Sequence, residues 1–383
     1  MWPNCFHRVI PLSSTSSFEV LTMLPSPPSA KVRSKTLFGV CLLLVLVSGL
    51  CTAFWTSTAR QWPAASFWQD GRGFRTLEQH FERHLLLHDP AVQSWNALRF
   101  AFFKEAHPAV LVGNRGWLFL AEEFRVDPQA AQQTQQHLRE IKQVQNQLQT
   151  VGASLVVVLI PAKAATYPDQ LARFVLPEAV QTRYAASRQA LGERGLAVVN
   201  LPPVFQAARS AREVFWHTDL HWTPYGAAQA AEATAQVVQQ AFPDVTLPKT
   251  RFKTVFAKPH VFNGDLLRYL DFGPWQVQLW PPSEQLTEAT TVAVDTSLLG
   301  ESSVPVALIG TSFSADPVWN FAGFLREALS AQVLNAAQDG LSPFEAMTRY
   351  LNSSEFSAQP PQLVVWEIPE RYLSTPSSVR GVR

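Results

Sequence analysis

Four short, almost unbroken apolar runs recur along the chain, and they limit the folds that it can adopt. They lie at residues 153–161, 197–201, 304–309 and 362–368. Such runs are typical of strands in parallel sheets, which are buried on both faces and therefore need no polar side chains. Helical patterns separate the runs, and strands that alternate with helices build a sandwich around a mostly parallel sheet. The chain is therefore predicted to be an α/β protein.

The other elements are predicted from periodicity and turn residues. A β-hairpin is expected at residues 110–120, with Asn114, Arg115 and Gly116 in its turn. Residues 242–301 show scattered strands, many prolines and no regular pattern. Helices are predicted at residues 74–88, 132–151, 179–192, 204–211, 224–240, 317–329 and 343–351, and a further short strand at residues 332–335.

An uncharged stretch near the N-terminus predicts a membrane anchor. Residues 36–59 contain no charged side chain and, as a helix, are long enough to cross a hydrocarbon core of roughly 30 Å. Three basic residues precede this stretch, so the positive-inside rule places the N-terminus in the cytoplasm and the bulk of the chain outside. The alternative is a signal peptide that is cleaved after the small residues Ser57 and Ala59.

This interpretation divides the chain into four parts. Residues 1–35 are expected to be a disordered cytoplasmic segment, residues 36–59 the anchor, residues 60–73 a linker and residues 74–383 an exported domain. Translation from Met23 would shorten the first part. All three cysteines lie in or before the anchor, so the exported domain has no disulfide or thiol chemistry. This pattern fits a domain in the bacterial periplasm that is tethered to the inner membrane.

Charge and histidine spacing say which partners are not expected. The 383 residues carry a net charge of +1 without a dense basic patch, so nucleic acid is not an expected partner. His80, His84 and His88 recur at a spacing of four on the flank of the helix predicted at residues 74–88. Zinc could use that spacing, but no acidic or cysteine partner completes a set, so a polar helix flank is preferred. No metal or cofactor is expected.

Asp219 and His221 are the first candidates for catalysis. In an extended segment, residues two apart project from the same face. The carboxylate would then orient one imidazole nitrogen and leave the other free to accept a proton, as in a Ser-His-Asp triad. The neutral form of His221 is the one that acts as a base, so activity should fall at acidic pH. The alternative for such a pair is a surface ion pair.

Ser312 is the candidate nucleophile. It follows the apolar run at residues 304–309 and lies on a turn that leads toward a helix. Ligands of open α/β sheets bind beyond the carboxyl ends of the strands, so Ser312 is expected at that edge. Glu367 and Arg371, at and after the end of the last strand, should reach the same edge.

Four motifs in a fixed order carry a family resemblance. They are GNRGWLF at residues 113–119, TDLHWTP at 218–224, GTSFS at 310–314 and WEIPERYL at 366–373. This series resembles the SGNH hydrolase-like polysaccharide O-acetyltransferases of alginate biosynthesis, a family also used in cellulose acetylation. The likeness covers roughly residues 74–373.

The resemblance implies a fold, an activity and partners. The fold is an SGNH-hydrolase-like three-layer sandwich, here preceded by one transmembrane helix. Ser312 is implied as the nucleophile, His221 as the general base and Asp219 as its orienting partner. The domain would be periplasmic, take acetyl groups delivered by a multipass membrane acyltransferase, and place them on hydroxyls of an exopolysaccharide such as alginate or cellulose.

Two departures separate this chain from the wider hydrolase superfamily. Thr311 stands where that superfamily has aspartate, and one residue rather than two separates Asp219 from His221. Both features match the acetyltransferase branch. Asn263 and Gly264 are candidates for a second oxyanion donor, with a structural turn as the alternative.

Aromatic and charged residues near the motifs are candidates for substrate binding. Most of the 12 tryptophans are expected in the core, and one or two at most should touch glycan. The candidate stacking residues are Trp216, Trp222, Trp319 and Trp366, and the predicted substrate-binding set is Trp222, Trp319, Glu367 and Arg371.

Two other functions remain open at this point. A periplasmic esterase that removes acetyl groups from carbohydrate would use the same acetyl-serine chemistry. A non-catalytic subunit that holds polysaccharide in an export complex would need no nucleophile.

Overall fold

The computed structural model describes residues 38–45, 47–48, 73–75, 78, 88–281, 284–294 and 304–375. The chain divides into two units, Met1–Asp89 and Pro90–Arg383, and the candidate site lies in the second. The described residues leave out the predicted N-terminal segment, the linker up to residue 72, most of the anchor, and most of the helix predicted at residues 74–88, with His80 and His84. These stay predictions. Within the described ranges, no helix combines the length and the apolar composition needed to cross a membrane.

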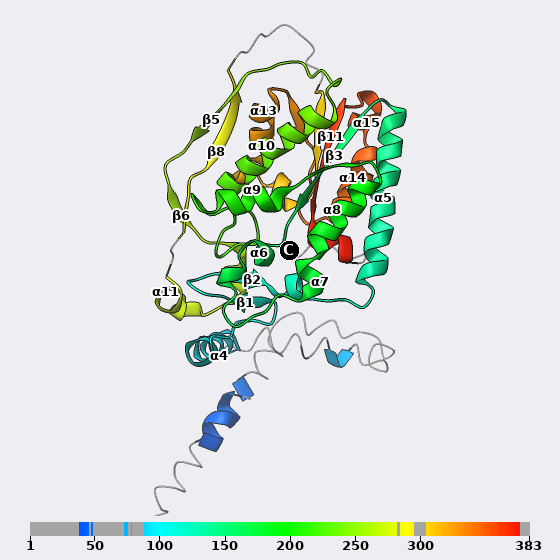
Figure 1. Ribbon diagram of the computed structural model, residues 1–383. Coiled ribbons are helices and arrows are strands. Elements are labelled where there is room, and N and C mark those ends of the chain that lie inside the picture. The colour runs from blue at the N-terminus through cyan, green and yellow to red at the C-terminus, as the bar shows by residue number, and fades with distance from the viewer. Residues whose placement is uncertain are drawn as a thin grey trace, which may run out of the picture. The chain divides into compact units, whose positions relative to one another are not determined.

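A five-stranded sheet forms the centre of the second unit (Figure 1). Its strand order is β10-β9-β11-β3-β4, and every neighbouring pair is parallel. All five strands predicted for the sheet are present, so the predicted α/β fold with a mostly parallel sheet is confirmed. The strands are β3 (Ser154–Ile160), β4 (Ala197–Val199), β9 (Val306–Ile309), β10 (Val333–Asn335) and β11 (Leu363–Pro369).

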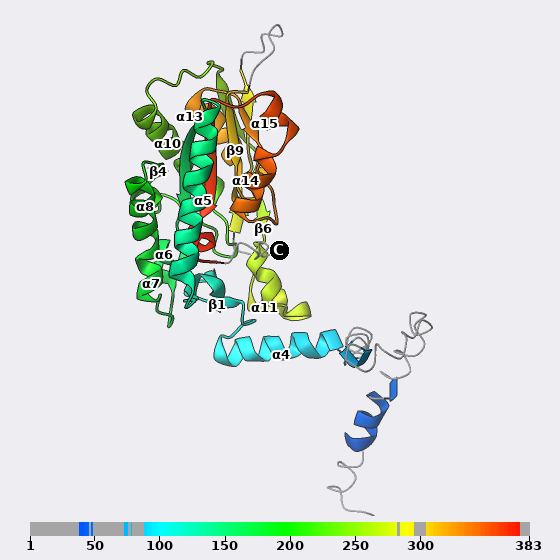
Figure 2. The same ribbon diagram turned by 90° about the vertical axis from the view of Figure 1, so that its right-hand side faces the viewer.

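Helices cover both faces of this sheet. In Figure 1 one set lies to the left of the sheet and the other to the right, and Figure 2 shows the second set facing the viewer. The first set is α9 (Leu201–Ala208), α10 (Pro224–Ala241) and α13 (Phe321–Leu329), and the second set is α5 (Ala130–Thr150), α8 (Arg183–Glu193) and α14 (Pro343–Leu351).

Strand β3 shows why the apolar runs are unbroken. Val156 and Val158 belong to the core beneath the first set of helices, whereas Val157 and Leu159 belong to the core beneath the second. This is the alternation that a strand imposes. Since each of these side chains is fully buried, each contributes about 1.5–3 kcal/mol to stability.

Several helix boundaries differ from the prediction for local reasons. The helix predicted at residues 204–211 is α9, which begins at Leu201 because prolines fit the first turn, where an N–H would be unpaired. The helix predicted at 317–329 is broken at Asn320, whose φ is 53°. The helix α4 (His88–Phe103) was not predicted, because exposed Trp95 and Phe102 lie among its apolar residues and obscure any amphipathic stripe.

Smaller elements join the sheet to the site. The predicted hairpin is present as β1 (Val110–Val112) and β2 (Leu118–Leu120). The region predicted to be irregular holds two antiparallel strand pairs, with short helical turns between β6 and β7. These pairs are β5 (Phe252–Phe256) with β8 (Ala289–Ala293), and β6 (His260–Phe262) with β7 (Glu284–Leu286).

Candidate active site

Three side chains predicted from the sequence meet beyond the carboxyl end of β9. The Nε2 atom of His221 lies 2.8 Å from Ser312 Oγ, and its Nδ1 atom lies 2.6 Å from Asp219 Oδ1. Asp219 and His221 are buried, with 3% and 5% of their surface exposed. The structure therefore places carboxylate, imidazole and hydroxyl in one hydrogen-bonded line.

The reason for the Asp219–His221 contact differs from the expected one. The segment is not extended: it is a bent loop closed by an antiparallel bridge between Phe215 and Trp222. Asp219 Oδ1 also accepts the backbone N–H of His221 at 2.9 Å, an aspartate turn of the kind that spans two residues. The spacing of two therefore brings the side chains together through a turn, and the prediction of strand alternation was wrong.

The hydrogen bonds around Asp219 fix its charge. Its Oδ2 atom accepts the backbone N–H of Asp265 at 2.7 Å. Burial alone would raise the pKa of Asp219, but the hydrogen bonds from His221 and Asp265, together with the charge of His221, lower this pKa to about 2. An ionised Asp219 accepts the proton of Nδ1, so the lone pair of His221 lies on Nε2 and faces Ser312.

Glu367 holds the turn that carries Ser312 through hydrogen bonds. Ser312 begins the short helix α12 (Ser312–Ala315). The buried carboxylate of Glu367 accepts the backbone N–H of Thr311 at 2.7 Å and the hydroxyl of Ser314 at 3.0 Å. A Cβ atom on Gly310 would lie 2.3 Å from Glu367 Oε2, so only glycine fits there. Glu367 is 0% exposed and cannot contact a glycan, which corrects its predicted role in substrate binding.

The tryptophans divide into buried supports and residues beside the site. Trp222 is fully buried and its indole N–H donates to Phe313 O at 3.0 Å, so it has no open face for a sugar and the predicted stacking role was wrong. Trp366 is likewise buried, with its N–H bonded to Pro343 O. Trp319 lies against the imidazole of His221, with ring centroids 5.2 Å apart and an interplanar angle of 25°. Trp319 is 3% exposed, and a contact between Trp319 and substrate beside His221 stays a prediction.

The second oxyanion donor is not Gly264. Its backbone N–H donates to Thr218 Oγ1 at 3.1 Å and is therefore already used. A Cβ at this position would lie 2.3 Å from the carbonyl carbon of Thr218, so the glycine permits close packing against the loop. The structural turn is the correct alternative. Asn263 is exposed and stays a prediction.

Arg371 lies at the edge of the sheet, as predicted. Its guanidinium is 6.0 Å from the ring centre of Phe313, the residue after Ser312, and 4.9 Å from the ring centre of Tyr372. The adjoining cavity measures only about 10 Å³, which is room for one water molecule. A contact between Arg371 and substrate stays a prediction.

Comparison with known proteins identifies the family. The family described as "SGNH hydrolase-like domain, acetyltransferase AlgX" matches residues 110–370. The chain belongs to this family of SGNH hydrolase-like acetyltransferases. The resemblance drawn from the four motifs is thereby confirmed.

Individual relatives of this acetyltransferase agree in sequence and structure. The probable alginate O-acetylase AlgJ of Azotobacter vinelandii is 35% identical over 352 residues, which are 89% of this chain and 88% of that protein. The solved O-acetyltransferase domain of Pseudomonas putida AlgJ is 35% identical, with a TM-score of 0.65 over 71% of this chain and 94% of that domain. Pseudomonas aeruginosa AlgX is 25% identical, with a TM-score of 0.54 over 68% of this chain and 62% of its own.

A buried lysine that the sequence did not reveal holds the loop of this acetyltransferase that carries Asp219. The Nζ atom of Lys163, just after β3, donates to the carbonyl oxygens of Leu118 at 2.6 Å, His217 at 2.9 Å and Asp219 at 2.9 Å. Lys163 is 2% exposed. Its three donors therefore satisfy the carbonyl groups of Leu118 and Asp219 and add a second hydrogen bond to His217 O, which also accepts the backbone N–H of Leu118 at 2.9 Å.

Glu284 in β7 binds the backbone N–H groups of the loop that carries Asp219. Its carboxylate accepts the backbone N–H of His217 at 2.6 Å, that of Thr218 at 3.0 Å and the hydroxyl of Thr218. A buried cation thus binds the carbonyls and a buried anion binds the amides. We call Lys163 and Glu284 the loop clamp. Lys163 and Glu284 are 121 positions apart in the chain, so no local sequence pattern indicates that both bind the loop that carries Asp219.

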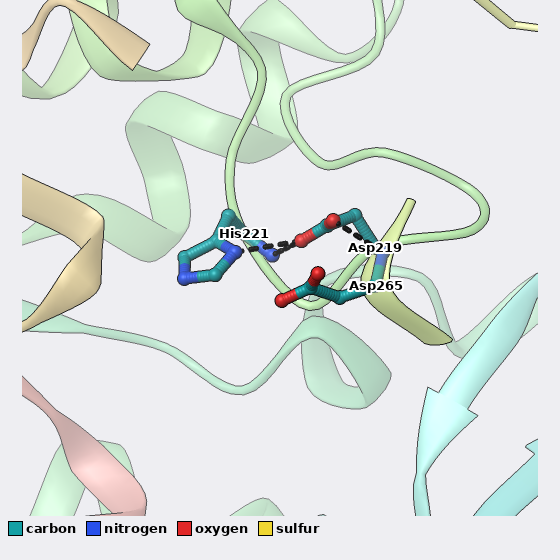
Figure 3. A group of neighbouring side chains, drawn as sticks. All are labelled: Asp219, His221 and Asp265. Atoms are coloured by element: carbon teal, nitrogen blue, oxygen red, sulfur yellow. Dashed lines mark hydrogen bonds and ion pairs between the residues drawn. The ribbon is translucent and has the colours of Figure 1, made fainter. Parts of the chain in front are cut away.

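Asp219, His221 and Asp265 form the one group of possible metal ligands among the described residues (Figure 3). Their ligand atoms lie within 4.8 Å of one another. Both oxygens of Asp219 already accept hydrogen bonds, from His221 and from the backbone of Asp265. The group therefore fits a hydrogen-bonded line better than a cation site.

Replacing Glu367 with glutamine should reduce the pH dependence of stability. Burial raises the pKa of Glu367 to about 7, and hydrogen bonds from Thr311 and Ser314 oppose this rise only in part. The folded state then binds a proton more tightly than the unfolded state, so this group's contribution to stability is lost as pH rises from about 4.5 to 7. The loss amounts to at most roughly 3.5 kcal/mol, since one pKa unit corresponds to about 1.4 kcal/mol.

Urea unfolding of the full chain at pH 5 and pH 8 measures this effect. The Glu367→Gln protein should lose less stability between the two pH values than the wild type. Glu178→Gln, at an exposed position, is the matched control and should behave like the wild type. Equal losses in the wild type and Glu367→Gln would contradict the proposed titration of Glu367.

Proposed function

We propose that this chain transfers acetyl groups onto hydroxyls of alginate through an acetyl-serine intermediate. The observation that carries the proposal is the hydrogen-bonded line from Asp219 through His221 to Ser312. The chain belongs to the acetyltransferase family, and the relatives of the chain include probable alginate O-acetylases.

In the first step, His221 Nε2 takes the proton of Ser312 as Oγ attacks the carbonyl carbon of the donor's acetyl group. The ionised carboxylate of Asp219 stabilises the imidazolium that forms. The tetrahedral intermediate then collapses, the bond to the donor's leaving group breaks, and His221 returns the proton to that group. The backbone N–H of Ser312, at the start of α12, is the proposed first oxyanion donor, and such donors are worth about 3–4 kcal/mol each.

In the second step, a sugar hydroxyl replaces the donor. His221 Nε2 removes the hydroxyl proton as the sugar oxygen attacks the acetyl-serine carbonyl. The bond to Ser312 Oγ breaks, and the proton passes back to that oxygen. The products are an O-acetylated sugar and the free serine, so no other reactant is consumed.

Location and donor follow the sequence prediction. We place the domain in the periplasm, tethered to the inner membrane by residues 36–59, with acetyl groups supplied by a multipass membrane acyltransferase. The support is the uncharged stretch with its preceding basic residues and the absence of cysteine from residues 52–383.

A transfer assay tests the proposed reaction. The full-length protein is incubated with 4-nitrophenyl acetate and mannuronate oligosaccharides, and the products are examined by mass spectrometry. We expect acetylated oligosaccharide and, after rapid acid quench, one acetyl group on the peptide that contains Ser312. Free acetate as the sole product, at a rate independent of oligosaccharide, would identify a hydrolase instead.

A further inference from the structure

A cleft of about 620 Å³ lies at the tip of the β1–β2 hairpin. Its lining does not include Asp219, His221 or Ser312. Figures 1 and 2 show the elements that form it, α4, β1 and α11 (Gln276–Leu279), gathered at one end of the unit. We call it the hairpin cleft. The lining residues used here are Phe100, Lys104, Arg115, Ala172, Arg173 and Trp280.

The hairpin cleft carries positive charge that is not neutralised. Lys104, Arg115 and Arg173 line it, and none of the described residues that line it is acidic. None of the three forms an ion pair with a residue that the structure describes. Arg173 donates one hydrogen bond, to Phe103 O at 3.3 Å, and all three residues are exposed. Lys104 Nζ lies 4.8 Å from the ring centre of Phe100, and the guanidinium of Arg173 lies 5.2 Å from that of Phe174. Neither ring neutralises the charge, so the cations can bind an anion.

An aromatic surface lies beside these charges. Trp280 is half-buried and packs against Phe100, with ring centroids 5.7 Å apart. Gly116 in the hairpin turn lies against the same indole, because a Cβ there would be 3.7 Å from its Cζ2 atom. A tryptophan ring that is fixed on one side and open on the other suits the apolar C–H face of a sugar.

The backbone at the hairpin cleft is held in unfavourable conformations. Six non-glycine residues in the described part of the chain have a positive φ, and three of them line this cleft: Lys104 at 55°, Arg115 at 50° and Ala172 at 54°. Such a conformation costs on the order of 1–2 kcal/mol for an ordinary residue and is concentrated at ligand sites. Two of the three cations are thus fixed in place at a cost to stability.

A second cleft, of about 420 Å³, continues from Arg115 toward the site. It reaches His217, two residues before Asp219. Among its other lining residues, Arg209 lies 2.8 Å from Asp169, and Glu213 lies 2.6 Å from His217. Arg115 is thus shared by the two clefts, and the second cleft links the hairpin cleft to the loop that carries the base.

We propose that the hairpin cleft binds uronate units of the acceptor polysaccharide, away from the unit that receives the acetyl group. Arginine binds a carboxylate through two parallel hydrogen bonds, lysine adds a point charge, and Trp280 stacks on the sugar ring. A neutral glucan offers no group for the three cations. This inference rests on the proposed function and adds that the carboxylates of the acceptor hold the chain at this subsite.

Binding measurements on the full-length protein test the subsite. The Arg115→Ala/Arg173→Ala protein should bind mannuronate oligosaccharides at least about tenfold more weakly than the wild type in isothermal titration calorimetry at low salt, because two charge-assisted contacts are lost. Arg188→Ala, an exposed arginine of α8 outside the clefts, is the matched control and should bind like the wild type. Neutral cello-oligosaccharides of equal length should bind the wild type at least about tenfold more weakly.

Three results would overturn the inference: unchanged affinity in the double variant with an unchanged melting temperature, equal binding of the neutral oligosaccharide, or tighter binding of a single-stranded oligonucleotide. Under the proposed function, hydrolysis of 4-nitrophenyl acetate by the wild type is expected to depend on Ser312 and to need no polysaccharide. If that hydrolysis is absent while the double variant still binds uronate weakly, the proposed function fails and the uronate site stands.

Discussion

Replacing Ser312 with alanine should lower acetyl transfer by about 10⁴-fold or more. Without the nucleophile, the hydrogen-bonded line of Asp219, His221 and Ser312 leaves only the catalysis that binding and oxyanion donors provide. Comparable deletions in serine hydrolases lower the rate by factors of this size. Ser312 is partly exposed, and among the residues that the structure describes its hydroxyl bonds only to His221. Loss of one oxygen there leaves the fold intact, so the melting temperature should stay within a few degrees of the wild-type value.

A double variant sharpens this test. His221 and Ser312 act as one unit, so their effects should not add: Ser312→Ala/His221→Ala should be no slower than Ser312→Ala alone. Ser357→Ala, at an exposed position of the same protein, is the control and should retain full activity. Acetylated oligosaccharide formed by Ser312→Ala at more than a hundredth of the wild-type rate would mean that another residue is the nucleophile.

The strands of the sheet could be predicted because each one is recognisable from its own run of apolar residues. A strand buried on both faces is almost wholly apolar, as β3 shows after Ser154 and β11 shows at every position except Glu367. The meeting of Ser312 with His221 was also predictable, because the carboxyl ends of parallel strands share one edge. The boundaries of α9 and α13 depended instead on individual residues such as Asn320, which a periodic pattern does not reveal.

The support of the site could not be predicted, because it depends on contacts between distant segments. Trp222 was predicted to face substrate, yet its indole N–H bonds to Phe313, 91 positions later. Gly264 was a guess for the oxyanion, yet its amide bonds to Thr218, 46 positions earlier. A residue type and a local spacing indicate chemistry, but only the fold decides which donor is already used.

The second large effect is expected at the loop clamp. Lys163→Met keeps the length of the side chain but removes all three donors, and each buried carbonyl left without a partner costs about 1–3 kcal/mol. The carbonyl of Asp219 loses the ammonium group, while that of His217 keeps the N–H of Leu118. The search of the Asp219 carbonyl for a new donor will draw the loop away from its position, and a displacement of about 1 Å in such a site can cost 10²-fold in rate. Acetyl transfer by Lys163→Met should therefore fall by about 10²-fold, measured at a temperature where the variant is folded. Lys258→Met, at an exposed position, is the control.

The pH dependence of acetyl transfer tests whether the charge of Lys163 positions Asp219 or whether Lys163 only stabilises the fold. Burial lowers the pKa of Lys163 to about 8, although the nearby carboxylates of Glu123, Glu284 and Asp219 raise it. Above this pKa the amine has two N–H groups for three carbonyls, so wild-type transfer should fall as pH rises through about 8. The same shift acts on stability with the opposite sign: the unfolded state binds more protons between pH 8 and about 10.5, so this group adds stability as pH rises through that window.

The alkaline loss of activity should therefore occur without unfolding. Circular dichroism and transfer rates recorded together from pH 7 to 9.5 test this, with the ester reaction corrected for its uncatalysed hydrolysis. The wild type should lose rate with an unchanged spectrum, and Lys163→Met, which cannot titrate, should show a flat profile in this range. A wild-type rate that stays constant to pH 9.5, or an alkaline fall of the same size in Lys163→Met, would show that the charge of Lys163 does not position Asp219.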